Sequence, residues 1–150
     1  MLAYIRFFIY LCNVKQNKQS MEYEMKQLSS KYPSNEELKQ MFNTILGYIR
    51  GSLVKGYMTE RNRQFFTWGA NNYKYISAND GLCYGIQFNV KGLLHKGRVR
   101  IYYNRVTDYF DVELLRARKD EMIWGCDELD FEQLHNVLHR HIERKDDPEV

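Results

Sequence analysis

The stretch GRVRIYYNRVTDYFDVELL, residues 97–115, decides the fold. Apolar or aromatic residues alternate with arginine and tyrosine in its first half and with acids in its second half. The positions on the apolar side are Val99, Ile101, Tyr103, Phe110, Val112 and Leu114. A period of two residues is typical of a strand that buries one face and exposes the other. Turn-forming residues separate the halves, so the stretch predicts an antiparallel hairpin.

The register of this hairpin follows from which residues share a face, because directly opposed residues of an antiparallel pair point to the same side. A two-residue loop would place Arg100 opposite Asp111. A four-residue loop, residues 105–108, would place Arg100 opposite Glu113 and Tyr102 opposite Asp111. Both registers set an arginine against an acid, whereas a slip by one residue would move Asp111 to the apolar face. We therefore expect a polar face on which opposite charges neutralise each other across the strands.

Further strands are predicted on both sides of the hairpin. Apolar and polar residues also alternate at residues 86–90, and a short strand at 122–124 follows the polar segment RARKDE. Upstream, aromatic runs broken by GANN and ANDG predict two short strands, at 64–68 and 73–77. The chain is thus expected to contain a meander of four to six antiparallel strands.

A helix is predicted at each end of this meander. Ser34 and Glu37 have the spacing of a capping box, and apolar residues then recur every three or four positions from about 35 to about 55, with Gly56 as the stop. Asp130 and Gln133 form a second capping box, followed by an apolar stripe at Phe131, Leu134, Val137, Leu138 and Ile142. The predicted fold class is α+β, with both helices on the apolar face of the sheet.

The chain of 150 residues fits one domain, which we place at residues 34–145. Residues 1–33 form a poorly defined extension that begins with MLAYIRFFIYLC, too short an apolar run for a membrane span. Translation starting at Met21 is an alternative, because a polar run separates the first segment from the rest. Residues 146–150 are expected to be a frayed, charged tail.

Composition limits the function without assigning it. The net charge is +3, which is low for a strong nucleic-acid binder. The three cysteines include no CxxC pair, which argues against a zinc ribbon and favours reduced thiols in a cytoplasmic protein. A disulfide between Cys83 and Cys126 is kept as an alternative. No catalytic constellation or cofactor motif stands out, so we expect a protein that is not an enzyme and has no cofactor.

One candidate binding surface lies on the polar side of the strands. Residues 91–105 carry five basic side chains and no acid, and Lys91, Arg98, Arg100 and Tyr102 share that face. Basic residues interleaved with aromatic ones can track phosphates and stack bases of single-stranded nucleic acid. The ordinary alternative is a solvated sheet face whose charges are already neutralised by Asp111 and Glu113.

A tryptophan beside a glycine and a pair of histidines are two further candidates for functional sites. Trp68, next to Gly69, is expected to be a core residue, with a surface anchor for a protein partner as the functional alternative. His135 and His139 lie four positions apart on the last predicted helix, where they are weak candidates for a metal site. The sequence assigns no third ligand, so no metal is predicted.

The segments FFTWGANNY, residues 65–73, and GLLHKGRVRIYYNRVTDYFDVELL, residues 92–115, resemble small proteins carried by bacterial mobile elements such as conjugative transposons. The resemblance spans about Phe65 to Ile142 and rests on structural motifs, so it transfers no functional residue. It implies a cytoplasmic accessory protein. We therefore expect a non-enzymatic binding module with a protein or nucleoprotein partner, and single-stranded nucleic-acid binding as the alternative.

Overall fold

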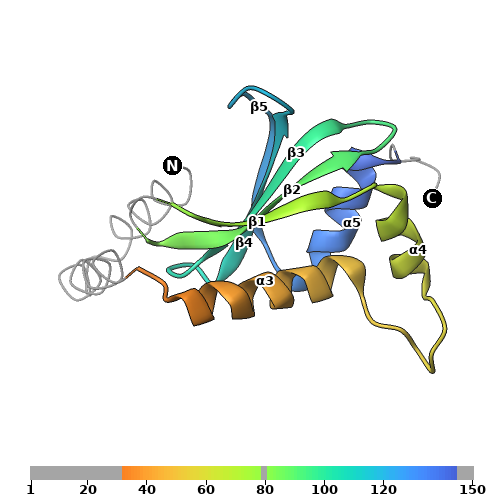
Figure 1. Cartoon of the computed structure of the whole chain (residues 1–150), viewed down its shortest axis with the longest axis horizontal. Helices are drawn as coiled ribbons and strands as arrows, with labels where there is room; N and C mark the ends of the chain where they lie inside the picture. The colour runs from red at the N-terminus through yellow and green to blue at the C-terminus, as the bar shows by residue number, and fades with distance from the viewer. Residues whose placement is uncertain (1–31, 79–80, 145–150) are drawn as a thin grey trace.

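The computed structural model describes residues 32–78 and 81–144, which form helices on one face of an antiparallel sheet (Figure 1). This confirms the predicted α+β class. Most of the predicted N-terminal extension, including Cys12 and Met21, and the predicted tail at 146–150 lie outside the described residues. Within the described part of the chain, no helix has the length and apolar character needed to cross a membrane.

The sheet is a five-stranded meander in which each strand pairs with the next one along the chain. The strands are β1 (Asn71–Ser77), β2 (Cys83–Lys91), β3 (Lys96–Asn104), β4 (Tyr109–Arg116) and β5 (Met122–Leu129). The predicted meander is therefore confirmed. The last strand is longer than the predicted 122–124, and it runs up to the residue before the cap of the final helix.

The β3–β4 hairpin has the register predicted for a four-residue loop. Arg100 lies opposite Glu113, and Tyr102 lies opposite Asp111. The side chain of Asn104, which is 1% exposed, accepts hydrogen bonds from the backbone N–H groups of Val106 at 2.9 Å and Thr107 at 3.3 Å. This Asx-type turn fixes the loop length and with it the register.

The first described helix, α3 (Asn35–Arg50), begins as its sequence predicts, because the side chain of Ser34 accepts a hydrogen bond from the N–H of Glu37 at 3.2 Å. It ends before the predicted position near residue 55. Gly51, at φ 77°, donates its N–H to the carbonyl of Gly47 and turns the chain out of the helix. Leu53 consequently lies outside the helix and is 58% exposed.

The predicted strand at residues 64–68 is wrong, because most of that segment belongs to the helix α4 (Glu60–Thr67). Thr59 and Asn62 form a reciprocal capping box, which fixes the start of the helix. Phe65 and Trp68, three residues apart, both point into the core, while Phe66 is 61% exposed. That burial has helical spacing, and it was hidden by the short run of adjacent aromatic residues.

The last helix, α5 (Phe131–Ile142), has the predicted capping box between Asp130 and Gln133. Its other end is capped by the loop between β2 and β3. The N–H groups of Leu94 and His95 donate to the carbonyl of Ile142 at 2.9 and 3.1 Å. Carbonyls of the last helical turn lack partners within the helix, so this contact fastens α5 to the hairpin.

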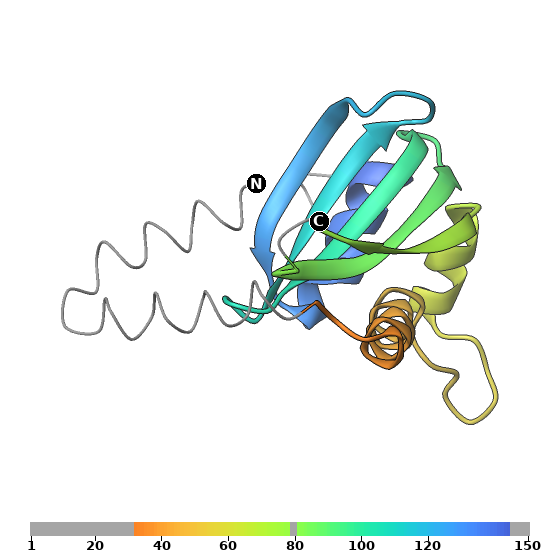
Figure 2. The same ribbon diagram turned by 60° about the vertical axis from the view of Figure 1, so that its left-hand side comes forward.

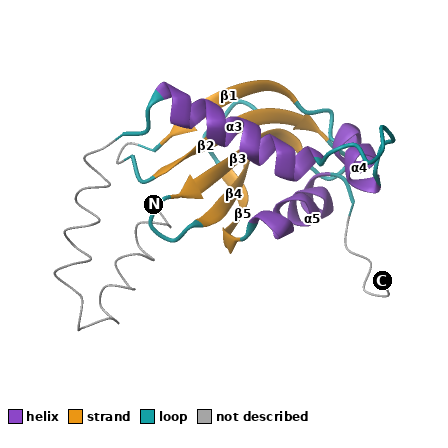
Figure 3. Ribbon diagram, turned by 90° about the horizontal axis from the view of Figure 1, so that it is seen from below, coloured by secondary structure: helices purple, strands orange, loops and turns teal. Residues whose placement is uncertain are grey.

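The helices α3 and α5 cover one face of the sheet, and α4 packs against both of them at one end of the layer (Figure 3). Their apolar residues meet the inward-facing side chains of β2, β3 and β4 in one cluster. Side chains at the centre of this cluster with no exposed surface include Ile45, Ile49, Trp68, Phe88, Ile101 and Leu138. We call the opposite side of the sheet the outer face.

Candidate binding surface

The outer face carries the polar residues that sequence reasoning singled out. Across β2 and β3, Gln87 lies opposite Arg100, Asn89 opposite Arg98, and Lys91 opposite Lys96. Arg98 is the diagonal neighbour of Lys91 on this face. The residue directly opposite Lys91 is a second lysine, so like charges meet at the tip of this hairpin.

The two arginines are held by the turn between β4 and β5 rather than by acids on β4. Asp120 lies 3.0 Å from Arg98 and 3.2 Å from Arg100, and both guanidinium groups lower the pKa of its carboxyl, Arg98 more strongly. Arg98 also donates to the carbonyls of Arg116 and Lys119, at 3.1 and 2.7 Å. Arg100 therefore lies opposite Glu113 in the backbone register, as predicted, but its guanidinium group contacts Asp120, which it shares with Arg98.

Arg100 is engaged on its other side as well, since its Nε donates to the side-chain oxygen of Gln87 at 2.8 Å. Its side chain is 23% exposed and that of Arg98 is 15% exposed. Neither guanidinium is therefore displayed to solvent as a phosphate-binding group would be. The acid that contacts both arginines is thus Asp120 of the turn, and not Asp111 or Glu113 as the sequence predicts.

Three further outer-face residues of the β3–β4 hairpin, Tyr102, Asp111 and Glu113, are partly or fully buried. Asp111 is 6% exposed, and its Oδ1 accepts a hydrogen bond from the N–H of Glu128 at 3.2 Å, where the pairing of β4 with β5 is irregular. Burial is the main cause that raises the pKa values of Tyr102 and Glu113. Tyr102 also packs near Cys83, so its ring is not a fully exposed stacking platform.

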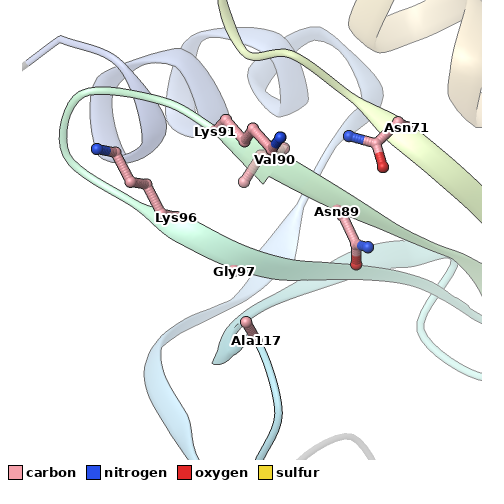
Figure 4. A pocket seen from close by; sticks show the side chains of 7 residues that line it. All are labelled: Asn71, Asn89, Val90, Lys91, Lys96, Gly97 and Ala117. Atoms are coloured by element: carbon pink, nitrogen blue, oxygen red, sulfur yellow. The ribbon is translucent and has the colours of Figure 1, made fainter.

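A shallow hollow of about 460 Å³ lies at the other end of the outer face, beside the β2–β3 hairpin tip (Figure 4). It is lined by Asn71, Asn89, Val90, Lys91, Lys96, Gly97 and Ala117. Figure 4 shows the two lysines on the two strands of the hairpin, with the two asparagines beside them. The lining contains no acid, histidine, cysteine or hydroxyl group, so it offers cationic and amide groups for binding and no nucleophile of those types.

The lysines of this hollow remain available to a ligand. Both are exposed, and among the described residues neither forms an ion pair. The half-buried amide of Asn89 makes no hydrogen bond within the described part of the chain, whereas Asn71 donates to the carbonyl of Gly69 at 2.8 Å. The backbone N–H of Lys91 donates to the carbonyl of Trp68 at 2.7 Å, which ties the rim of the hollow to the core.

Trp68 is a core residue and not a surface anchor, because its side chain has no exposed surface. Its indole N–H donates to Nδ1 of His139 at 2.9 Å. The ring stacks on His135 with a centroid separation of 5.3 Å, and its edge packs against Phe65. An indole needs a hydrogen-bond acceptor when it is buried, and the helix α5 provides one.

Both ring nitrogens of His135 have partners within the protein. His135 is 1% exposed, its Nδ1 donates to the carbonyl of Ile49 at 2.6 Å, and its Nε2 lies 2.8 Å from the side-chain amide of Gln64. Burial is the main cause that lowers the pKa values of both histidines, which favours neutral rings. Among the described residues no group of three or more His, Cys, Asp or Glu is placed to hold a metal.

Cys83 and Cys126 do not pair with each other. Cys83 lies in β2 and Cys126 in β5, and two strands separate them in the sheet. Neighbouring strands lie about 4.8 Å apart, so this separation exceeds the reach of a disulfide.

Comparisons with known proteins leave the chain without an assigned family. No family model matches it, and neither does any curated protein or solved structure.

Sequence reasoning chose one of the two lysines of the hollow as a site residue and missed the other lining residues. Lys91 was singled out, but Lys96 and Asn89 were not chosen as site residues, although a four-residue loop after Lys91 would have set them on the same face. Asn71 had no such signal, because an irregularity between Asn71 and Lys74 shifts the pairing of β1 with β2. Asp120 was assigned to a polar break, since its contact with the arginines depends on how that turn folds.

Proposed function

We propose that this protein is a non-enzymatic binding module whose outer face binds an acidic segment of a protein partner. The observation that carries the proposal is the lysine pair of the hollow. Lys91 and Lys96 lie directly opposite each other and are exposed, and no described acid neutralises them. Like charges held side by side repel, and an incoming carboxylate removes that repulsion.

The polar groups around the lysines suit a peptide ligand. The half-buried amide of Asn89 can donate to and accept from a peptide backbone. β1 is the outermost strand on this side of the sheet, so one of its edges offers backbone groups for pairing with an extended segment. An acidic peptide that follows β1 would therefore meet the lysines at one end of its path.

Single-stranded nucleic-acid binding is the second candidate, and it has less support. Of the residues that suggested it, Arg98 and Arg100 are held by Asp120, and Tyr102 is half-buried. A nucleic acid would have to break the contacts of Asp120 before either guanidinium could reach a phosphate. The charge left for phosphates is then mainly that of the lysine pair, which is little for strand binding.

The test measures binding of a fluorescent Glu-rich peptide by anisotropy, with Lys91→Ala/Lys96→Ala as the test variant. Two exposed ion pairs contribute about 0.4–2 kcal/mol together, so the affinity should fall by roughly twofold to thirtyfold. Lys39→Ala/Lys55→Ala removes the same charge from exposed sites away from the outer face and should change the affinity little. Equal losses in the two variants would contradict the proposal.

A single-stranded oligonucleotide in the same assay separates the two candidates. Stronger binding of the oligonucleotide, lost in Arg98→Ala/Arg100→Ala, would favour the nucleic-acid function. The setting that we propose, an accessory protein of a bacterial mobile element in the cytoplasm, rests on the resemblance of residues 65–73 and 92–115. Recovery of one specific partner from cells that carry such an element, and its loss in the lysine variant, would support that setting.

A further inference from the structure

A projection formed by residues 51–59 joins α3 to α4 and extends away from the sheet and the helices (Figures 1 and 2). Asn62, which is 3% exposed, fastens both ends of it. The side-chain Nδ2 of Asn62 donates to the carbonyl of Arg50 at 2.7 Å, and its Oδ1 accepts from the N–H of Thr59 at 2.8 Å. The projection is thus a closed loop on a fixed base.

The tip of the projection is a tight turn. Val54 and Tyr57 exchange two backbone hydrogen bonds, at 3.0 and 2.9 Å. Lys55 and Gly56 between them have positive φ values of 51° and 79°, as a type I′ turn requires. Because the turn closes on itself, the backbone at the tip of the projection is held in a defined conformation.

Four apolar side chains are displayed by this tip. Tyr57 is 78% exposed, Leu53 and Val54 are each 58% exposed, and Met58 is 43% exposed. They are adjacent along the loop, unlike the scattered single apolar residues that are normal on protein surfaces. A contiguous exposed apolar group of this kind marks a surface that another phase or molecule covers.

The charge around the tip indicates what covers it. Residues 50–63 contain four basic side chains, Arg50, Lys55, Arg61 and Arg63, and one acid, Glu60. Their net charge of +3 equals that of the whole chain. Glu60 is itself paired with Arg63 at 3.4 Å. Lys55 lies at the tip, and the three arginines lie at the base of the projection, on α3 and α4. An apolar tip above a basic base complements a surface that is negatively charged outside and apolar beneath, which describes an anionic lipid bilayer.

We propose that residues 51–59 are a membrane-docking element that inserts Leu53, Val54, Tyr57 and Met58 into the headgroup region of an anionic bilayer. The convex shape favours a bilayer over a protein groove, because lipids rearrange around a small tip. Lys55 at the apex extends its apolar stem beside the inserted side chains and keeps its ammonium among the phosphates. This surface is separate from the lysine hollow, so the two binding functions do not depend on each other.

The experiment is flotation of the full chain with vesicles of phosphatidylcholine alone or mixed with phosphatidylglycerol. We expect binding to the mixed vesicles only, and weaker binding at high salt. Leu53→Ser/Tyr57→Ser should lower the bound fraction at least tenfold, and Lys55→Ala should weaken binding about fivefold. Leu93→Ser is the matched control, because Leu93 is 80% exposed in the β2–β3 loop, outside the projection.

All variants retain residues 1–20, so binding caused by that apolar segment would survive the tip substitutions and would overturn the proposal. Absence of binding to the mixed vesicles would overturn it as well. As an independent measurement, Tyr57→Trp places an indole at the tip, and its emission should shift to the blue with mixed vesicles. An unchanged emission spectrum would contradict insertion. Far-ultraviolet circular dichroism of each variant checks that the fold is retained.

Discussion

Gly92, in the loop between β2 and β3, lies directly against the end of α5, and its replacement by alanine should destabilise the protein strongly. A Cβ at this position would lie 2.5 Å from Cγ2 of Ile142 and 2.8 Å from its carbonyl carbon, and still closer to the carbonyl oxygen. Backbone atoms at a helix end cannot move aside as a flexible side chain can. The β2–β3 loop must therefore shift away from the end of α5.

That shift breaks the two hydrogen bonds that Leu94 and His95 donate to the carbonyl of Ile142. Each such bond contributes about 0.5–1.5 kcal/mol, and leaving the carbonyl of a fully buried residue without a partner costs about 1–3 kcal/mol. We expect Gly92→Ala to lower the free energy of unfolding by about 2–4 kcal/mol. With a urea slope of about 2 kcal/mol per molar, the unfolding midpoint should fall by about 1–2 M.

The assay is urea unfolding followed by circular dichroism, together with hydrogen exchange at the amides of Leu94 and His95. Gly47→Ala is the matched control. Gly47 lies inside α3, a Cβ there meets nothing within 4 Å, and alanine should stabilise the helix by about 0.5–1 kcal/mol. If Gly92→Ala unfolds at the same urea concentration as the parent chain, the contact between the hairpin and the helix end does not stabilise the fold.

Three further outcomes are expected. His135 and His139 have pKa values lowered from the ordinary 6.5, so their stabilising contribution is complete above that pH and is lost as the pH falls below it. Urea unfolding at several pH values should show that the free energy of unfolding falls by at most about 1.4 kcal/mol per pH unit for each histidine. The variant His139→Gln keeps an acceptor for the indole N–H and should make this dependence on pH less steep. Asn62→Ala removes the two hydrogen bonds that hold the base of the projection. It should lower the free energy of unfolding by about 1–3 kcal/mol in the same urea assay and make residues 51–59 more sensitive to proteolysis. Asp120→Asn should release the arginines of β3 and raise oligonucleotide affinity at low salt, which anisotropy measures; unchanged affinity would show that Asp120 does not mask them.

The hairpins were predictable from sequence because their determinants are local. Alternation assigns each residue of β2, β3 and β4 to a face, and the loop length then fixes which residues oppose each other. The pairing of Arg100 with Glu113 at the backbone level follows from those two facts alone. Helix starts were predictable for the same reason, since a capping box needs only four consecutive residues.

The short helix α4 and the core histidine were less accessible to such reasoning. Eight residues with two adjacent phenylalanines do not show whether burial repeats every second residue or every third and fourth. His135 looked like a surface residue because α5 has a clear apolar stripe without it. It is buried because α3 and α4 both pack on α5 and provide a carbonyl and an amide for its ring. The burial of His135 depends on contacts among three helices, so the sequence of α5 alone does not predict it.

The displacement of the candidate site from the arginines to the lysines has a similar origin. Backbone register sets which Cα atoms face each other, but long side chains choose their partners over a wider radius. Arg98 and Arg100 have acids or polar groups within reach on several sides, and the turn carboxylate of Asp120 reaches both at once. Lys91 and Lys96 lie at the same end of the sheet as this turn, and Ala117 of the turn lines the hollow beside them, but Asp120 contacts the two arginines and forms no ion pair with either lysine. On the β2–β3 hairpin, Asp120 therefore engages the arginines and leaves the charge of the lysine pair available, so a ligand that needs this charge binds at the hairpin tip.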